Sequence, residues 1–295
     1  MELNAANRAM LSQGYNASFQ VGLMHRPPMW QEAAMLVPST TSENVYDWLK
    51  DTFKILEWMG DRNKQNIATA DYVVKNRKFE GTIGVNRDKV ADNQYGSYNK
   101  RFEQMGQRVS TFPDSLVFQL MKAGFTTNCW DGQYFFDVDH PVGLQGSEVS
   151  VSNFMGGSGE GWYIMDSKQL MKPFIFQERE KFKLVMKDKE TDDNVFDRNE
   201  LVYGVDGRCN AAYGLWQLCF ASKQTLDVTN VKAALTAFGA QRDDSGEPLQ
   251  LDADTIFVSP NLREAARDLF SKDLIAKETN TLKNRLNVVS SGFLL

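Results

Sequence analysis

The chain has 295 residues, of which 42% are hydrophobic and 24% charged, values typical of a globular protein with a sizeable core. Its 33 basic and 38 acidic side chains give a net charge of -5, which excludes a general positive field for wrapping nucleic acid. Three cysteines without a CxxC spacing argue against a disulfide framework and a structural zinc site, and no stretch approaches the roughly 18 apolar residues that span a membrane.

The first forty residues carry weak helical signals. Within residues 4–22 a few apolar side chains fall on one side of a loose helix, and Pro27-Pro28 then enforces an extended bend. Residues 30–37 form a short apolar segment. We therefore expect an N-terminal extension that becomes ordered against the rest of the protein or against a partner.

Residues 45–78 mix aromatic and basic side chains. Gly60-Asp61 offers a turn between two strand-like runs, which predicts a long two-stranded loop that leaves the body and returns to it. Such a hairpin is marginal alone in water, and its tryptophans favour a partner subunit as the surface that it covers. An ordinary meander folded over its own core is the alternative. The candidate inter-subunit contact residues are Trp48, Phe53, Trp58, Arg62 and Lys64.

A strand followed by a long helix is the organising unit of the sequence. Residues 79–86 alternate apolar or small side chains with polar ones, which predicts a strand with one buried face. From Tyr98 to Ala123 apolar residues recur three or four positions apart, which predicts an amphipathic helix roughly 39 Å long. Pro113 lies inside this helix and removes one backbone hydrogen bond.

The middle of the chain predicts short strands joined by turns. Asp131-Gly132 lies between aromatic runs and signals a tight turn. The glycine-dense run at residues 156–161 lacks the Gly-Lys-Ser/Thr ending of a phosphate loop, so we expect a flexible surface connection. Strands are expected at residues 162–165, 174–177, 182–186 and 201–203, and a buried strand over the apolar run 213–220.

The last quarter predicts a small α/β module. Residues 231–238 carry an apolar stripe that predicts a helix, with Thr229 as its cap. Residues 255–259 predict a buried strand, which is followed by a helix at residues 262–270 and a second strand at residues 286–289. Where a nucleotide-binding fold places glycines after the strand, this chain has Pro260-Asn261, so the sequence predicts no dinucleotide and no other cofactor.

Cys129 and His140 are the sharpest candidates for chemistry. A thiol nucleophile needs a base that generates the thiolate, and the base needs an orienting carboxylate such as Asp137 or Asp139. These surroundings do not match a known cysteine-enzyme motif, and the same four side chains lack a recognised metal-ligand spacing. We favour a small buried thiol and a histidine that fixes a turn. The sequence therefore predicts no catalytic residue and no metal site.

Several blocks of residues along the chain form a distinctive set. The most specific is Cys129-x-Asp131-Gly132-Gln133-x-Phe135-Phe136-Asp137-x-x-His140-Pro141-Val142. Others are Tyr46-x-Trp48-Leu49, Phe79-Glu80-Gly81-Thr82-x-Gly84-x-x-Arg87-Asp88, Tyr203-Gly204-Val205-Asp206-x-Arg208 and Asn284-Arg285-Leu286-x-Val288-Val289. Together they resemble the major head (capsid) subunit family of bacteriophage Mu and Mu-like prophages, and the similarity spans essentially the whole chain.

The resemblance implies an α+β fold, the Hong Kong 97-type major capsid fold. That fold has an N-terminal arm, an extended β-hairpin loop, a peripheral domain with a long spine helix, and an axial α/β domain. The corresponding segments here are 1–44 for the arm, 45–78 for the loop, 79–222 for the peripheral domain and 223–295 for the axial domain. The strands at 162–220 resemble strands that usually close the chain, and here they precede the axial module, so their assignment stays open.

The resemblance also implies a function. A major capsid protein of a tailed bacteriophage or prophage assembles into the hexamers and pentamers of an icosahedral shell that encloses double-stranded DNA. Its implied partners are copies of itself, a scaffold or protease, a portal, decoration proteins in some relatives, and packaged DNA contacted non-specifically on the inner face. It is a virion component assembled in the bacterial host cytoplasm, without a membrane. The alternatives are a cysteine-dependent hydrolase using Cys129 and His140, or a tube- or filament-forming virion protein.

Overall fold

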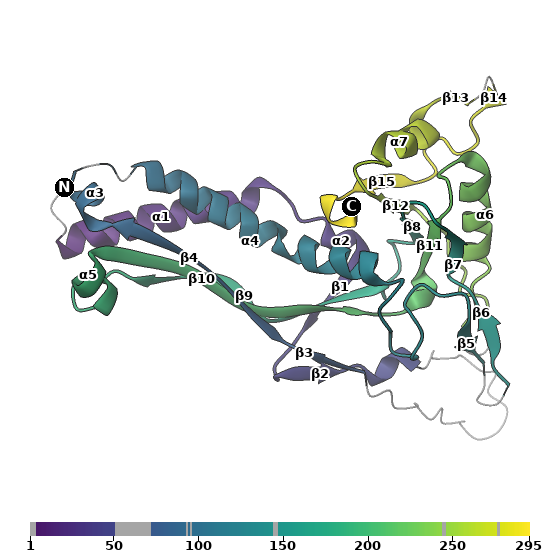
Figure 1. The fold of residues 1–295 in the computed structure, drawn as a ribbon, viewed down its shortest axis with the longest axis horizontal. Helices are drawn as coiled ribbons and strands as arrows, with labels where there is room; N and C mark the ends of the chain where they lie inside the picture. The colour runs from purple at the N-terminus through teal and green to yellow at the C-terminus, as the bar shows by residue number, and fades with distance from the viewer. Residues whose placement is uncertain are drawn as a thin grey trace, which may run out of the picture.

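The computed structural model describes residues 4–50, 72–92, 94, 96–143, 147–243, 246–275 and 278–295. Figure 1 shows these residues arranged as a long arm joined to a compact lobe. The arm carries two long helices on a sheet, and the lobe holds a second sheet with shorter helices. Across the described ranges, no helix has the length and apolar character needed to cross a membrane.

The arm is built on a four-stranded sheet in the order β1-β9-β10-β4. β10 pairs antiparallel with both β9 and β4, and β1 joins the far side of β9 in parallel. The strands are β1 Ala34–Pro38, β4 Arg77–Asn86, β9 Phe174–Lys187 and β10 Glu200–Tyr213. The two strands predicted within residues 174–186 are therefore one strand, because Glu178 and Glu180 between them remain paired with β10.

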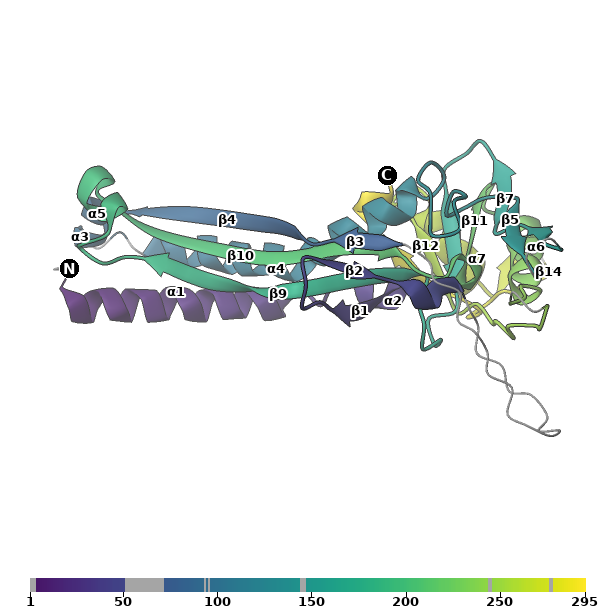
Figure 2. The same cartoon turned by 90° about the horizontal axis from the view of Figure 1, so that it is seen from below.

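Two helices, α1 (Ala5–His25) and α4 (Gly96–Ala123), lie side by side on one face of this sheet (Figure 1, Figure 2). The predicted amphipathic helix is confirmed as α4, which continues through Pro113. α1 is longer and more regular than its sequence pattern indicates. Its first turn begins at Asn4, whose side chain accepts a hydrogen bond from the backbone N–H of Asn7 at 2.9 Å, as N-terminal caps do.

The two helices meet backbone to backbone where glycines face each other. A Cβ atom on Gly22 would lie 2.0 Å from the carbonyl oxygen of Glu103, and one on Gly106 would lie 2.1 Å from that of Phe19. Real Cβ atoms essentially never come within 3.0 Å of such an atom. Only glycine therefore permits this separation between α1 and α4.

This close crossing completes an aromatic core between the helices and the sheet. Tyr15 of α1 stacks on Phe102 of α4 with ring centroids 4.4 Å apart, and both rings meet Tyr203 of β10 edge-on at 5.3 Å. Ser12 donates a hydrogen bond of 2.6 Å to Asp188, in the loop that follows β9. The first helix is therefore part of the arm's own core.

A buried carboxylate holds the segment that follows α1. Asp114 of α4 accepts hydrogen bonds from the backbone N–H groups of Met29 at 2.8 Å and Trp30 at 2.7 Å. These donors open the short helix α2 (Trp30–Ala33), which leads directly into β1. Burial raises the pKa of Asp114, while the two N–H donors act in the opposite direction. The bend at Pro27-Pro28 is thereby fixed against α4.

The lobe contains a five-stranded sheet in the order β15-β12-β8-β11-β7. β12 pairs in parallel with β15, as expected when a helix connects two strands, and β8 pairs antiparallel with β12 and β11. The strands are β7 Phe154–Gly157, β8 Trp162–Met165, β11 Cys219–Lys223, β12 Thr255–Val258 and β15 Asn287–Ser290. The predicted boundary between residues 222 and 223 falls inside β11, so this sheet draws strands from both sides of it.

Two local predictions near this sheet are wrong. The glycine-rich run is not a free surface connection, because β7 pairs in parallel with β11 and a Cβ atom on Gly157 would lie 2.4 Å from the backbone of Lys223. The apolar run at residues 213–220 is not one strand but the end of β10, the turn η2 (Trp216–Leu218) and the start of β11. It is apolar throughout because it passes, buried, from one sheet to the other.

The helices of the lobe confirm the predicted module. They are α6 (Val228–Gly239) and α7 (Arg263–Ser271). Asp227 caps α6 in place of Thr229, since its carboxylate accepts from the backbone N–H of Asn230 at 2.9 Å. The remaining elements outside the loop region are α3 Arg87–Ala91, β5 His140–Val142, β6 Val149–Val151, α5 Asp193–Arg198, β13 Leu274–Ile275, β14 Glu278–Thr279 and η3 Gly292–Leu294.

Replacing Gly106 with alanine should destabilise the arm, because the new methyl group meets the backbone of α1 and the helices must separate. We expect the free energy of unfolding to fall by about 2 kcal/mol or more, although alanine favours a helix by about 1 kcal/mol. Gly14→Ala is the matched control: it also lies mid-helix but has open space around it, so it should stabilise. Urea unfolding of both variants measures this, and equal stability would contradict the tight crossing.

Candidate functional site

The predicted loop begins and ends at a short antiparallel pair, β2 (Glu43–Val45) with β3 (Val73–Lys75). Trp48 follows in the turn η1 (Asp47–Lys50), where it is half-buried and packs edge-on against Tyr46 with centroids 6.0 Å apart. Four of the predicted contact residues lie outside the described residues: Phe53, Trp58, Arg62 and Lys64. Their contact with a partner subunit stays a prediction, and Trp48 packs on its own chain.

The base of this loop is fastened to the arm by a buried amide. Gln177 of β9 is fully buried, and its side-chain oxygen accepts a hydrogen bond of 2.7 Å from the Tyr46 hydroxyl. Its amide nitrogen donates to the carbonyl oxygen of Val74 at 3.2 Å and to the side chain of Asn76 at 2.8 Å. One glutamine thus holds both ends of the loop at a fixed place. No local pattern predicts this contact, because Gln177 lies more than a hundred positions from each residue that it binds.

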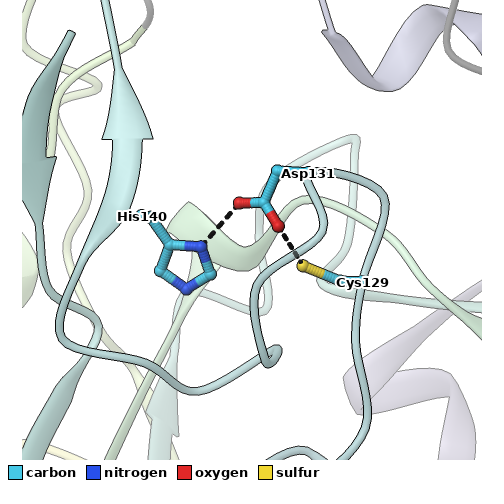
Figure 3. Close-up of side chains that lie close together, drawn as sticks. All are labelled: Cys129, Asp131 and His140. Atoms are coloured by element: carbon cyan, nitrogen blue, oxygen red, sulfur yellow. Dashed lines mark hydrogen bonds and ion pairs between the residues drawn. The ribbon is translucent and has the colours of Figure 1, made fainter.

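Cys129, Asp131 and His140 come together in the lobe (Figure 3). The Cys129 thiol donates to one carboxylate oxygen of Asp131 at 2.9 Å, and Nδ1 of His140 lies 2.6 Å from the other. The ring of His140 is fully buried and stacks on the ring of Trp216, with ring centroids 3.9 Å apart and an angle of 9° between the planes. The carboxylate beside His140 is therefore Asp131, of the predicted tight turn, and not Asp137 or Asp139.

This arrangement does not generate a nucleophile. Burial raises the pKa of Cys129, and the neighbouring negative charge of Asp131 raises it further. Burial alone would also raise the pKa of Asp131, but hydrogen bonds from His140 and Cys129 outweigh it and lower that pKa. The carboxylate stands between the thiol and the imidazole, and its negative charge disfavours the thiolate that a nucleophile requires. The geometry instead fastens the turn at residues 128–134 to β5.

The same three residues are the one group in the described ranges whose ligand atoms lie near enough together to hold an ion, all within 4.8 Å of one another. Both Asp131 oxygens already accept hydrogen bonds from the other two residues. Asp137 and Asp139, which the sequence placed beside Cys129 and His140, do not join the group. The network joins the thiol, the carboxylate and Nδ1 of His140, and within the described residues the buried Nε2 of His140 has no hydrogen-bond partner.

Large apolar side chains are exposed at separate points on the surface. Phe196 protrudes from α5 at the tip of the arm, Leu170 from the turn before β9, and Met24 from the end of α1. The polar sequences around Phe196 and Leu170 gave no helical or strand periodicity from which to infer their exposure. Such side chains are candidate contact points for other molecules.

Asp131→Asn should weaken the buried network by removing its charged acceptor. We expect the free energy of unfolding at pH 7 to fall by about 1–3 kcal/mol. Because the folded-state pKa of Asp131 is lowered, its contribution is present above the unfolded-state pKa and is lost as the pH falls through the folded value. The difference in the free energy of unfolding between Asp131→Asn and the unmodified chain should therefore shrink below about pH 4. Urea unfolding across this range tests the prediction, with Asp197→Asn, at an exposed position in α5 away from the cluster, as control.

Solved structures with similar folds are phage capsids. A chain of the bacteriophage JBD30 procapsid superposes with a TM-score of 0.88 at 33% identity, with 99% of this chain and 100% of that chain covered. The JBD30 capsid gives a TM-score of 0.78 at 26% identity, with 92% of both chains covered. The likeness confirms the predicted α+β capsid fold.

Sequence comparisons agree along the whole length. The major capsid protein of Escherichia phage Mu is 36% identical over 293 residues, which cover 97% of this chain and 96% of the relative. The Mu-like prophage FluMu major head subunit of Haemophilus influenzae is 35% identical over 279 residues, with 92% and 91% covered. These relatives are structural head subunits, so the hydrolase and tube-protein alternatives are wrong. Residues 9–294 match the family model, and the chain belongs to the Mu-like prophage major head subunit gpT family.

Proposed function

We propose that this chain is the major capsid protein of a Mu-like phage or prophage, and that its copies build the icosahedral shell around double-stranded DNA. The observation that carries the proposal is the match from end to end with a chain of the JBD30 procapsid at 33% identity. The match covers 99% of this chain, so the likeness extends over both the arm and the lobe.

The shape of the subunit supports this role. A closed shell needs heterologous contacts that join into rings, here hexamers and pentamers. We expect the long arm, shown in Figure 1 and Figure 2, to reach across neighbouring copies and to provide contact area. We expect each subunit to bury more than roughly 2,000 Å² against its neighbours, the range of permanent assemblies.

In our proposal, each segment of the chain corresponds to one part of the capsid fold. Residues 1–44 serve as the N-terminal arm of the capsid fold, which is only the first segment of the elongated arm described above. Residues 45–78 serve as the extended loop. Residues 79–222, apart from β7, β8 and β11, serve as the peripheral domain, with α4 as its spine helix. Residues 223–295 form the core of the axial domain. We assign β7, β8 and β11 to the axial domain as well, because they share its sheet and its hydrophobic core.

Other partners follow from the role. A scaffold or protease would guide assembly in the bacterial host cytoplasm, and a portal would occupy one vertex. The JBD30 capsid is also known decorated with minor capsid protein trimers, which supports a decoration partner for this chain. The net charge of -5 favours non-specific, weak contact with packaged DNA on the inner face.

Expression of the chain with its scaffold should give closed particles, visible by negative-stain electron microscopy. Cys129→Ala should form the same particles, because the thiol serves the buried network and no reaction. The measurement compares particle yield for both proteins by sedimentation. Soluble protein that never multimerises under any assembly condition would overturn the proposed function.

Two tryptophan substitutions separate folding from assembly. Trp48→Ala should lower the melting temperature of the unassembled subunit, because Trp48 packs against Tyr46 within the chain. Trp58→Ala should leave that melting temperature unchanged and reduce particle yield several-fold, as expected of an inter-subunit contact. Thermal unfolding and sedimentation measure the two effects. A Trp58→Ala subunit that is destabilised yet assembles normally would contradict the contact role.

A further inference from the structure

In the described part of the chain, one edge of the lobe sheet has no neighbouring strand. β15 is the outermost strand beside β12, and Figure 1 shows it on the side of the lobe nearest the arm. The backbone N–H groups of Asn287 and Ser291 donate to carbonyl oxygens beside the two ends of β12, at 2.7 and 3.1 Å. In a parallel pair such donors alternate along the strand, so the N–H and C=O groups of Val288 and Ser290 point away from β12. Within the described residues, no hydrogen bond reaches these outward groups.

A groove of about 580 Å³ lies along this edge and is lined by all of β15, residues 287–290. Its opposite wall is the link from α1 to α2, which includes Pro27 and Pro28. Neither proline has an N–H group, and across the described residues no backbone hydrogen bond joins this wall to β15. The volume lies within the roughly 300–1,000 Å³ that is usual for ligand-binding clefts. The groove therefore has room for a ligand beside an unpaired strand.

Two arginines give this groove a positive charge. Arg26 lines it from the end of α1, and Arg263 lines it from the first turn of α7. Neither forms an ion pair in the described part of the chain. Glu32 is the one acidic residue that lines the groove, and Lys172 lies beside it, since its amino group donates to the Glu32 carbonyl oxygen at 3.3 Å. The groove is therefore suited to a ligand that carries carboxylates.

We propose that an extended acidic segment of another protein binds in this groove and adds a sixth strand to the lobe sheet. Val288 and Ser290 offer two N–H donors and two carbonyl acceptors, spaced two residues apart along β15. An extended polypeptide matches this spacing with donors and acceptors of its own, which is how peptides join exposed sheet edges. A nucleic acid backbone does not match it, because phosphate oxygens accept hydrogen bonds but donate none to the two carbonyl groups. Carboxylates of the added strand would pair with Arg26 and Arg263.

A second copy of this chain matches the groove less well. The long open edges of its arm sheet are β4 and residues 179–187 of β9. That part of β9 carries four cations and one carboxylate, and β4 begins with Arg77-Lys78, so both would meet the arginines of the groove with like charge. The acidic segment at residues 137–139 is another candidate, but the N–H and the carbonyl oxygen of Asp137 are both already hydrogen-bonded to Asn153. The acidic strand therefore comes from a different protein.

Peptide binding to the unassembled subunit tests the proposal directly. The probe is a fluorescent heptapeptide of alternating valine and glutamate with blocked ends, and fluorescence anisotropy measures its binding. The peptide should bind saturably, whereas the same peptide with lysine in place of glutamate should not bind. A version that is N-methylated at every residue keeps the carboxylates but loses its N–H donors, so its affinity should be lower by about tenfold or more.

Arginine variants locate the site. Arg26→Gln and Arg263→Gln should each weaken binding of the glutamate peptide several-fold, because each removes a charged partner of a carboxylate. Arg267→Gln is the matched control. Arg267 lies one turn further along α7, is exposed and does not line the groove, so its substitution removes the same charge and should leave binding unchanged. The melting temperature, measured by circular dichroism, should be alike in all three variants.

The outcomes distinguish this inference from its alternatives. Equal binding of the N-methylated peptide would mean attraction by charge alone and would overturn the added strand. Failure of the glutamate peptide to bind, or equal weakening by Arg267→Gln, would overturn the site. If the unmodified subunits instead associate with one another in sedimentation and Arg263→Gln separates them, the occupant is a second copy, which contradicts the proposal. Particle assembly plays no part in these measurements, so the proposed function and this inference can fail independently.

Discussion

The arm depends on one contact, the crossing of α1 and α4 at Gly22 and Gly106. At that point each helix lies against the carbonyl oxygens of the other, and no larger residue fits. The crossing brings Tyr15 and Phe102 into stacking distance and closes the core over the sheet. Since the two helices cover one face of the sheet, the packing of the arm depends on two positions that lack a side chain. The same crossing turns the opposite side of α1 outward, where it is available for other contacts.

Buried polar side chains fix the segments that the apolar core does not. Asp114 holds the start of α2, Gln177 holds the base of the loop, and Asp131 joins the turn at residues 128–134 to β5. Asn153 is a further example, since its fully buried amide donates to the carbonyl oxygens of Phe135 and Trp216. Asp114, Gln177 and Asn153 are satisfied by partners distant in sequence, and Asp131 by partners two and nine positions away. Each group therefore selects one arrangement of loops among many apolar alternatives. This specificity, and not chemistry at a reactive centre, explains why a histidine, a thiol and a carboxylate meet in a structural protein.

Function in this family lies on surfaces more than in a pocket. A shell subunit must be rigid enough to hold its neighbours at set angles and must still offer contacts weak enough to correct errors. The buried polar contacts supply the rigidity, and exposed side chains such as Phe196 and Leu170 offer small apolar areas. Each is too small to associate stably alone, so association depends on many contacts forming together. The elongated arm spreads these contacts over a greater distance than a compact subunit could.

Local periodicity in the sequence determined α4, β4, α6 and α7, because each buries one regular face. The strands β8, β12 and β15 were found instead as short apolar runs, and β8 and β12 are buried at every position. The tight turn at Asp131-Gly132 and the residue blocks that resemble the family are also local features of the sequence, and both predictions are confirmed. Tertiary structure alone decided the rest. The continuity of β9 through Glu178 and Glu180 and the entry of β11 into the lobe sheet depend on residues distant in sequence. Asp131 lies only nine positions from His140, but no periodic pattern indicates which nearby aspartate the histidine meets. α1 shows the reason most clearly. Apolar side chains occur on both its buried and its exposed sides, so the sequence shows no clear helical periodicity, and only the fold shows which side is buried.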